Sequence, residues 1–248
     1  MLSNMKLRRL WVLPALLLCL LLGVWFYFAP PPGGLLSRAA ERRVSLERAP
    51  NTRELGGIPL RTGTFRKGMV YRSGALCFVT PSDSQALAAL KIRTVLDFRT
   101  ATEITRDGPD RPDLVTTSLP MRLRFLGAAG YASLPRDFSP QFRSVFSILS
   151  RSESYPVLYH CAVGKDRTGI VTALLLELLG ADRPTIMDDY LQSARNSRRL
   201  FVRAGWLEGL FGAIDAPPGG IEAYLGSLGI DGGTRTAIRT LLIEPHAP

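Results

Sequence analysis

One short segment in the second half of the chain combines residue types that could attack a phosphate group and hold it. Residues 160–169 read HCAVGKDRTG, which places five residues between Cys161 and Arg167. A thiolate is a strong nucleophile, and an arginine offers two parallel donors to two phosphate oxygens. Together these side chains predict the hydrolysis of phosphate esters by a nucleophilic cysteine.

The residues on either side of this segment predict how the cysteine is positioned. The apolar run at 156–160 is typical of a buried strand, and residues 168–179 predict a helix that ends at Gly180. Cys161 would then lie between the end of a strand and the N-terminus of a helix. There, free amides and the helix dipole favour a thiolate, and they also bind anions.

The rest of the loop is expected to bind the phosphate of the substrate. Its backbone amides belong to Ala162, Val163, Gly164 and Lys165. Gly164 lets the backbone curl around the anion, and Lys165 adds a positive charge at the rim. Thr168 is expected to donate a hydrogen bond to the sulfur of Cys161, which helps the thiolate to leave in a second step. We expect His160 to brace the loop by hydrogen bonds rather than to act as a base.

The surrounding chain predicts an α/β fold. Besides the strand that precedes the loop, strands are expected at 69–72 and 94–98. Helices are expected at 81–90, where Thr80 forms the N-cap, and at 139–149. Two or three more helices would fill the last third of the chain. This alternation indicates a mainly parallel sheet with helices on both faces, and a ligand site at the carboxyl ends of its strands.

The loop resembles the signature His-Cys-x5-Arg-[Ser/Thr] of the cysteine-based protein tyrosine phosphatase superfamily. Its GKDRTG part is similar to a bacterial branch of broad-specificity tyrosine and phosphoinositide phosphatases. Further stretches are similar to elements of that branch: NTRELGG at 51–57, YRSG at 71–74, LDFR at 96–99 and DYL at 189–191. The resemblance covers about residues 50–243.

This resemblance implies a fold, a mechanism and a class of substrate. It implies the protein tyrosine phosphatase fold and a double displacement without a metal ion or another cofactor, in which Cys161 takes the phosphoryl group and water then releases it. A loop that contains a lysine, here Lys165, is associated in this superfamily with phosphoinositide as well as phosphoprotein substrates. The expected partner is therefore a phosphorylated protein or a phospholipid head group.

The resemblance leaves the general acid open. Many members of the superfamily place this acid on a separate loop with the sequence Trp-Pro-Asp, which the chain lacks. In the GKDRTG branch the aspartate of the loop is the proposed acid, and it corresponds to Asp166. The alternatives are Asp97, at the end of a predicted strand, and Asp137, in a predicted loop that could fold over the site. Asp97 could equally hold an arginine of the loop in place.

The composition restricts the other functions that the chain could have. The formal net charge is +10, from 31 Lys and Arg against 21 Asp and Glu, which attracts phosphorylated substrates and acidic lipid surfaces. No basic run alternates with aromatic residues in the folded region, so nucleic acid is not an expected partner. Only two histidines occur, His160 and His246, which argues against a histidine-rich metal centre. The other cysteines, Cys19 and Cys77, are interpreted as apolar filler.

The N-terminal part of the chain predicts a membrane anchor. A basic segment at 1–9 precedes an uncharged run at 10–29, which as a helix would span the roughly 30 Å hydrocarbon core of a bilayer. We interpret this run as an uncleaved transmembrane helix that leaves the folded domain on the periplasmic or outer side. The alternative is a signal peptide cleaved near residue 39, which would give a secreted protein. A Pro/Gly linker at 30–45 then leads to a phosphatase domain at 46–244.

Two other classes of function fit parts of the pattern. A phosphate-binding pseudophosphatase would be expected to lack the cysteine, the arginine or the hydroxyl of Thr168, and none is missing. A sulfur-transfer or redox protein also needs a reactive cysteine, but no second cysteine lies close in sequence to Cys161. The sequence therefore favours a metal-independent phosphatase.

Overall fold

The computed structural model of the chain describes residues 42–111, 114–196 and 202–246. The predicted anchor at 10–29, the basic segment before it, most of the linker after it and Cys19 lie outside the described residues. Within the part of the chain that is described, no helix is both long and apolar enough to cross a bilayer.

A five-stranded sheet positions the loop. Its strand order is β1–β4–β7–β5–β6, and every neighbouring pair is parallel except β1 with β4. The strands are β1 (Arg53–Glu54), β4 (Val70–Ser73), β7 (Val157–His160), β5 (Thr94–Asp97) and β6 (Thr116–Ser118). Ser73 and Asp97, at the ends of two strands, both pair with His160 at the end of the central one. The carboxyl ends of three strands therefore meet beside Cys161, and the prediction of a mainly parallel sheet is confirmed.

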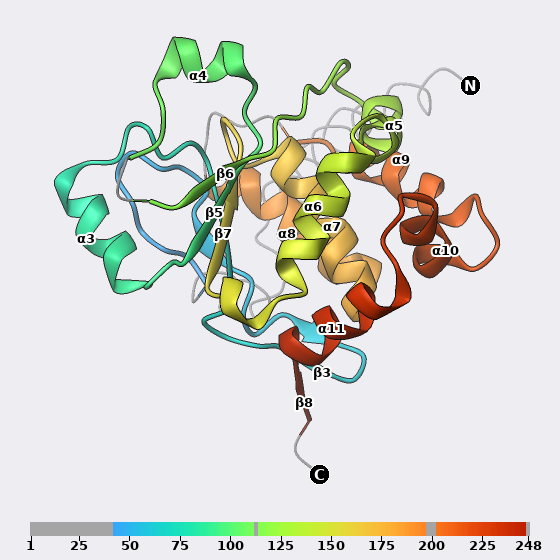
Figure 1. The fold of residues 1–248 in the computed structure, drawn as a ribbon. Helices are drawn as coiled ribbons and strands as arrows, with labels where there is room; N and C mark the ends of the chain where they lie inside the picture. The colour runs from blue at the N-terminus through green and yellow to red at the C-terminus, as the bar shows by residue number, and fades with distance from the viewer. Residues whose placement is uncertain (1–41, 112–113, 197–201, 247–248) are drawn as a thin grey trace, which may run out of the picture. The chain divides into compact units, whose positions relative to one another are not determined.

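Helices cover both faces of this sheet. Val157 and Tyr159 of the central strand belong to the larger hydrophobic cluster, whereas Leu158 packs with Leu87 in a smaller one, because successive side chains of a strand point to opposite faces. Figure 1 shows α3 on one side of the sheet and α6, α7 and α8 on the other. The helices are α3 (Pro81–Ala89), α6 (Ser139–Leu149), α7 (Asp166–Leu179), α8 (Arg183–Asn196), α9 (Ala204–Asp215), α10 (Gly220–Ser227) and α11 (Gly232–Leu242).

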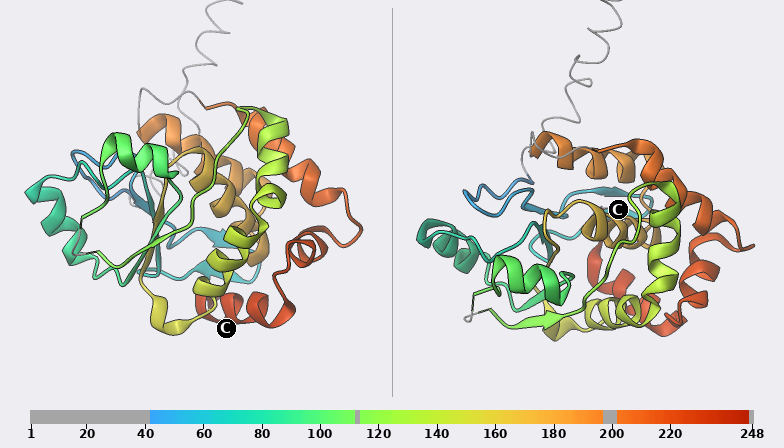
Figure 2. Two further views of the ribbon diagram at one scale, coloured as in Figure 1. Left: turned by 45° about the horizontal axis from the view of Figure 1, so that its top comes forward. Right: turned by 90° about the horizontal axis from the view of Figure 1, so that it is seen from above.

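The helix that follows the loop is the central one of its layer. All residues of α7 are buried except Asp166 and Glu177. This helix contacts β7, α8, α10 and α11, and the view from above in Figure 2 shows it in the middle of the helical layer. Its N-terminus, and therefore the loop, is held by the surrounding helices.

Most of the predicted elements are confirmed, with ends that differ by no more than two residues. Thr80 forms the expected capping box with Asp83, and Gly180 ends α7 in a left-handed conformation. The expected number of helices after residue 180 is wrong, because the described residues contain four there.

Several elements had no predicted counterpart. They include the edge strands β1 and β6, the helices α4 (Ala101–Asp107) and α5 (Ala128–Asp137), and a small antiparallel sheet of β2 (Pro59–Leu60), β3 (Gly63–Phe65) and β8 (Ile243–Pro245). Strands of two or three residues are too short to show an alternating pattern. Helix α5 contains Gly130 and Pro135, which disfavour a helix locally, and its packing against α9 overrides that preference.

A buried carboxylate on α8 connects segments that are distant in sequence. Asp189 accepts hydrogen bonds from Arg42, Arg53 and Arg72 at 3.0, 3.1 and 2.7 Å. Burial alone would raise the pKa of Asp189, but the arginines outweigh burial and hold the pKa well below its ordinary value. This carboxylate therefore stays ionised, and it fixes β1 and β4 to α8.

The ion-pair cluster around Asp189 predicts a large loss of stability when its charge is removed. Asp189→Asn should lower the free energy of unfolding by about 3 kcal/mol, because it leaves buried guanidinium groups without a counter-charge. The matched control is Asp188→Asn, whose partner Arg195 lies at the surface, and it should cost less than about 1 kcal/mol. Urea unfolding followed by circular dichroism measures both. Equal losses in the two variants would contradict this role of Asp189.

Candidate active site

Cys161 lies between the end of β7 and the start of α7, as predicted. Its side chain is 1% exposed, and residues 162–165 separate it from the first residue of the helix. The strand, the loop and the helix therefore place a buried thiol beside a helix N-terminus.

The amides of this loop lack acceptors. No acceptor in the described chain receives a hydrogen bond from the backbone N–H groups of Ala162, Val163, Gly164, Asp166, Arg167 and Thr168. Unpaired amides in a largely buried segment are rare, because each costs free energy. An anion with several oxygens would supply the acceptors, so the geometry agrees with the predicted phosphate cradle.

The curve of the loop depends on Gly164. Its φ is +68°, and a Cβ there would collide with the carbonyl of Ser73. The carbonyl of Gly164 accepts hydrogen bonds from Asn51 Nδ2 at 2.7 Å and from Arg72 Nη2 at 2.8 Å. Because both donors are buried and Arg72 is itself held by Asp189, the curve of the loop is tied to the ion-pair cluster.

Thr168 has a buried hydroxyl that makes no hydrogen bond in the structure, so the expected bond to the sulfur of Cys161 is not formed. A helical threonine often donates to the carbonyl four residues earlier. That carbonyl belongs to Gly164, and two other donors already saturate it. The hydroxyl of Thr168 is therefore left available to a group that enters the loop.

The two Nη atoms of Arg167 are held by hydrogen bonds, and one edge of its guanidinium stays free. Its Nη1 donates to the carbonyls of Phe98 and Met121 at 3.0 and 3.2 Å. Its Nη1 and Nη2 also donate to the two carboxylate oxygens of Glu103 at 2.7 and 2.6 Å. The Nε–H and the second Nη2–H of Arg167 donate no hydrogen bond within the described chain. These two groups point in parallel from one edge of the guanidinium. This edge is a two-pronged donor for phosphate oxygens.

Glu103 keeps its negative charge under all ordinary conditions. Burial raises the pKa of Glu103, but hydrogen bonds from Arg167 and from the amide of Thr100 outweigh it and lower the pKa to about 2. For Arg167, burial lowers the pKa, and the charges of Cys161 and Glu103 more than offset this, so that its pKa is raised. The pair is therefore ionised across the whole neutral range.

Asp166 faces the same pocket as Arg167. Its Oδ1 accepts a hydrogen bond from the hydroxyl of Tyr131 at 2.5 Å and lies 3.3 Å from Lys165 Nζ. Burial, and then the charge of Asp166, raises the pKa of Tyr131 well above its ordinary value, so this hydroxyl remains a donor. Lys165 was expected at the rim, but it is buried, because its ammonium packs 5.0 Å from the ring centre of Trp206 and pairs with Asp166.

Asp97 holds an arginine, but one outside the loop. Arg99 Nε donates to both oxygens of Asp97 at 3.0 Å, whereas Arg167 is held by Glu103. Asp97 is buried and does not line the pocket beside Arg167. Its geometry therefore agrees with a structural role and gives no support to the role of general acid.

His160 braces the loop, as expected. Its Nε2 lies 2.7 Å from Asp110 Oδ2, and its Nδ1 lies 3.3 Å from the carbonyl of Cys161.

The side-chain O and N atoms of Asp97, Asp110 and His160 lie within 4.8 Å of one another, which is close enough for a metal ion. However, Arg99 donates to both carboxylates, so a cation already occupies this position and the cluster is an ion-pair network.

Two other expectations fail. Asp137 was expected in a loop that could fold over the site, but it is the exposed last residue of α5 and accepts a hydrogen bond from Ser133. Cys77 was expected to be buried filler, but it is partly exposed and its sulfur accepts a hydrogen bond from Arg99 at 3.3 Å. Burial is the largest influence on Cys77, and it raises the pKa of this thiol.

A pocket of about 480 Å³ opens beside Arg167. It is lined by Thr100, Thr102, Glu103, Arg122, Leu123, Leu126, Asp166 and Arg167. This volume lies in the range of small-molecule sites.

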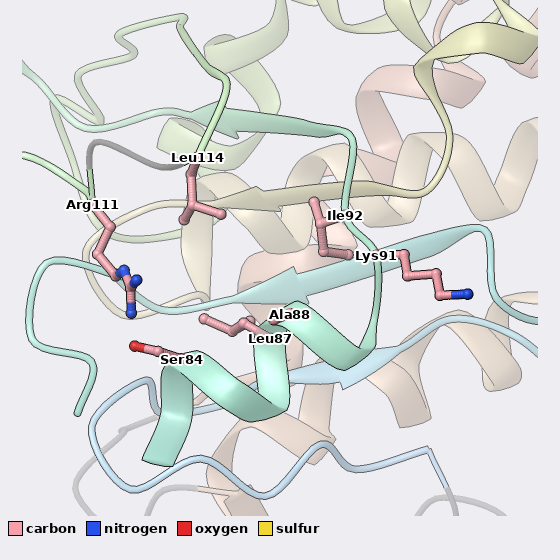
Figure 3. A pocket seen from close by; sticks show the side chains of 7 residues that line it. All are labelled: Ser84, Leu87, Ala88, Lys91, Ile92, Arg111 and Leu114. Atoms are coloured by element: carbon pink, nitrogen blue, oxygen red, sulfur yellow. The ribbon is translucent and has the colours of Figure 1, made fainter. Parts of the chain in front are cut away.

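A separate pocket of about 180 Å³ lies beside α3, and Figure 3 shows Leu87, Ile92 and Leu114 around it. It contains none of the predicted site residues, so we do not assign it to the active site.

Two residues of the site, Glu103 and Tyr131, were not predicted from the sequence. The spacing of Thr100 and Glu103 is that of a capping box, which predicts the start of α4 but not a contact with Arg167. Tyr131 lies in the helix with unfavourable local propensity, so nothing in the pattern marked it.

Comparison with known proteins identifies the family of the chain. The sequence model of the tyrosine phosphatase family matches residues 44–244. A tyrosine-protein phosphatase of Nostoc commune is 29% identical over 206 residues, which cover 64% of this chain and 69% of that protein. A putative tyrosine-protein phosphatase of Cupriavidus necator is 27% identical over 217 residues, which cover 71% and 80%. The triple specificity protein phosphatase PtpB of Mycobacterium tuberculosis is 30% identical over 182 residues, which cover 56% and 65%.

The contacts of Arg167 predict that Glu103 is needed for activity. Glu103→Gln keeps the shape and the capping bond but removes the charge, so Arg167 should be less well oriented and kcat/KM should fall roughly ten-fold. Because the pKa of Glu103 is about 2, its titration does not set the acid limb of the wild-type pH profile, and that limb should be unchanged in the variant. Steady-state kinetics between pH 4 and 8 measures both quantities.

The control for Glu103 is Asp107→Asn on the same helix, which removes an exposed pair with Arg106. This control should leave the rate within about two-fold of the wild type, because exposed ion pairs contribute little. If Glu103→Gln were as active as this control, Arg167 would not depend on Glu103.

Proposed function

Because the chain belongs to the tyrosine phosphatase family, we propose that it hydrolyses phosphate monoesters through a phosphocysteine formed on Cys161. The observation that carries this proposal is the loop itself, in which unpaired amides and the free edge of Arg167 surround the end of β7. These donors match the three oxygens of a phosphoryl group and favour its additional negative charge in the transition state.

In the first step the sulfur of Cys161 attacks phosphorus. The S–P bond forms while the bond between phosphorus and the leaving oxygen breaks. Asp166 takes up a proton from solvent when the anionic substrate binds beside it, and it gives this proton to the leaving oxygen. Among the described residues, Asp166 is the aspartate that lines the pocket beside Arg167, which supports its choice over Asp97 and Asp137.

In the second step water attacks phosphorus, and the carboxylate of Asp166 accepts the proton of this water. The S–P bond breaks, inorganic phosphate is released, and the sulfur of Cys161 leaves as a thiolate. The unpaired hydroxyl of Thr168 would then donate a hydrogen bond to this thiolate, which makes it a better leaving group.

The proposed substrates are phosphotyrosine and the phosphate of a lipid head group. The family supports the first, and the PtpB relative is described as having triple specificity. The predicted anchor at 10–29 would hold the domain close to a membrane, which brings lipid head groups within reach. We propose the periplasmic or outer face for the domain.

Removing the nucleophile tests the mechanism directly. Cys161→Ser should reduce the hydrolysis of p-nitrophenyl phosphate by roughly a thousand-fold or more, because a hydroxyl is not ionised at neutral pH. The variant should still bind inorganic phosphate, since the amides and Arg167 are unchanged, and isothermal titration calorimetry measures this. Cys77→Ser is the matched control and should stay active. Substantial turnover by Cys161→Ser would overturn the assignment.

The role of Asp166 is tested by comparing two leaving groups. With p-nitrophenyl phosphate, Asp166→Asn should slow the reaction little, because p-nitrophenolate leaves without a proton. With an alkyl phosphate the rate should fall by roughly a hundred-fold, the effect of a lost general acid. Asp137→Asn is the control and should change neither rate. If Asp166→Asn slowed both substrates equally, Asp166 would shape the loop instead of supplying a proton.

A further inference from the structure

The pocket beside Arg167 is formed by three separate segments. Thr100, Thr102 and Glu103 come from the start of α4, and Asp166 and Arg167 from the start of α7. The third segment lies between β6 and α5, and its lining residues are Arg122, Leu123 and Leu126. Figure 1 shows α4 and this third segment at the same edge of the sheet. The pocket therefore extends from the phosphate-binding arginine to a segment that the mechanism does not use.

The charges that line the pocket are not fully paired. Glu103 pairs with Arg167, and Asp166 pairs with Lys165. The guanidinium of Arg122 is exposed and has no hydrogen bond or ion pair within the described part of the chain. Both carboxylates of the pocket are thus already neutralised, and Arg122 is a positive charge without a partner on the same wall.

Apolar side chains lie beside this charge. Leu126 is 65% exposed although it lines the pocket, and Leu123 is partly buried. Exposed apolar surface in a concave site is stabilised when the carbon framework of a ligand covers it. The wall therefore offers one contact to an anion and another to a carbon framework.

We propose that Arg122 binds a second anionic group of the substrate, so that the enzyme prefers phosphate monoesters that carry another phosphate or a carboxylate on the same molecule. This inference rests on the proposed function, because it assumes that the first phosphate is held by Arg167. With the first phosphate in the loop, the framework of the substrate lies along Leu123 and Leu126, and the second anion meets the guanidinium of Arg122. A hydrogen bond between two charged groups adds about ten-fold or more to affinity.

Two matched pairs of soluble substrates test the proposal on the full chain in detergent. The first pair is inositol 1,4-bisphosphate and inositol 1-phosphate. The second pair is two phosphotyrosyl peptides that differ only in an aspartate or an asparagine next to the phosphotyrosine. For each pair the measured quantity is the ratio of kcat/KM for the substrate with the second anion to kcat/KM for the substrate without it.

The wild type should prefer the second anion in at least one pair, and Arg122→Gln should reduce that ratio about ten-fold, mainly through KM. Arg124→Gln is the matched control, because Arg124 is also exposed but does not line the pocket, and it should keep the wild-type ratio. A preference confined to the inositol pair assigns the second anion to a head group. A preference confined to the peptides assigns it to an acidic side chain.

Three results would overturn the proposal: no preference in either pair, a ratio unchanged by Arg122→Gln, or an equal loss in Arg124→Gln, which would indicate general attraction of anions. Hydrolysis of p-nitrophenyl phosphate by the wild type separates these results from a failure of the proposed function. If that substrate is hydrolysed and Cys161→Ser abolishes its turnover, the proposed phosphatase activity is supported independently of the substrate ratios.

Discussion

The loop depends on one buried carboxylate. Asp189 holds Arg72, and Arg72 in turn donates to the carbonyl of Gly164, where the loop turns most sharply. Because Asp189 belongs to α8 and Arg72 to β4, this chain of contacts fixes the loop to two elements that are far apart in sequence. A buried ion pair of this kind contributes less to stability than its contacts suggest, since desolvation offsets much of the attraction. Its clearer effect here is on geometry, because it holds the donor that binds the carbonyl of Gly164.

The same contacts explain why the loop contains polar groups without partners. Gly164 accepts two hydrogen bonds, so its carbonyl cannot accept one from Thr168, and the amides around it make no hydrogen bond within the described chain. Such groups cost free energy in the folded protein, and a well-packed scaffold is needed to offset that cost. Helix α7 is almost entirely buried, so the surrounding helices supply this scaffold.

Charge in the site is arranged in pairs that leave specific edges free. Glu103 takes one side of the guanidinium of Arg167 and leaves the Nε edge for a ligand. Tyr131 and Lys165 have a similar effect on Asp166. Both contact its Oδ1, and neither contacts its Oδ2. In each case the partner orients the group and leaves part of it free, as the proposed roles of Arg167 and Asp166 require.

The local parts of this protein follow from its amino-acid pattern alone. The residues around Cys161 and Arg167, from the apolar run at 156–160 to Gly180, were enough to predict the strand, the loop and the helix. These features follow from residues that are neighbours in the chain, whose conformations depend on local propensity and pattern. The contacts of Glu103 with Arg167 and of Tyr131 with Asp166 depend instead on how the elements pack in space. Those contacts join segments more than thirty residues apart, and no local pattern records which side chains the packing of the sheet and helices brings together.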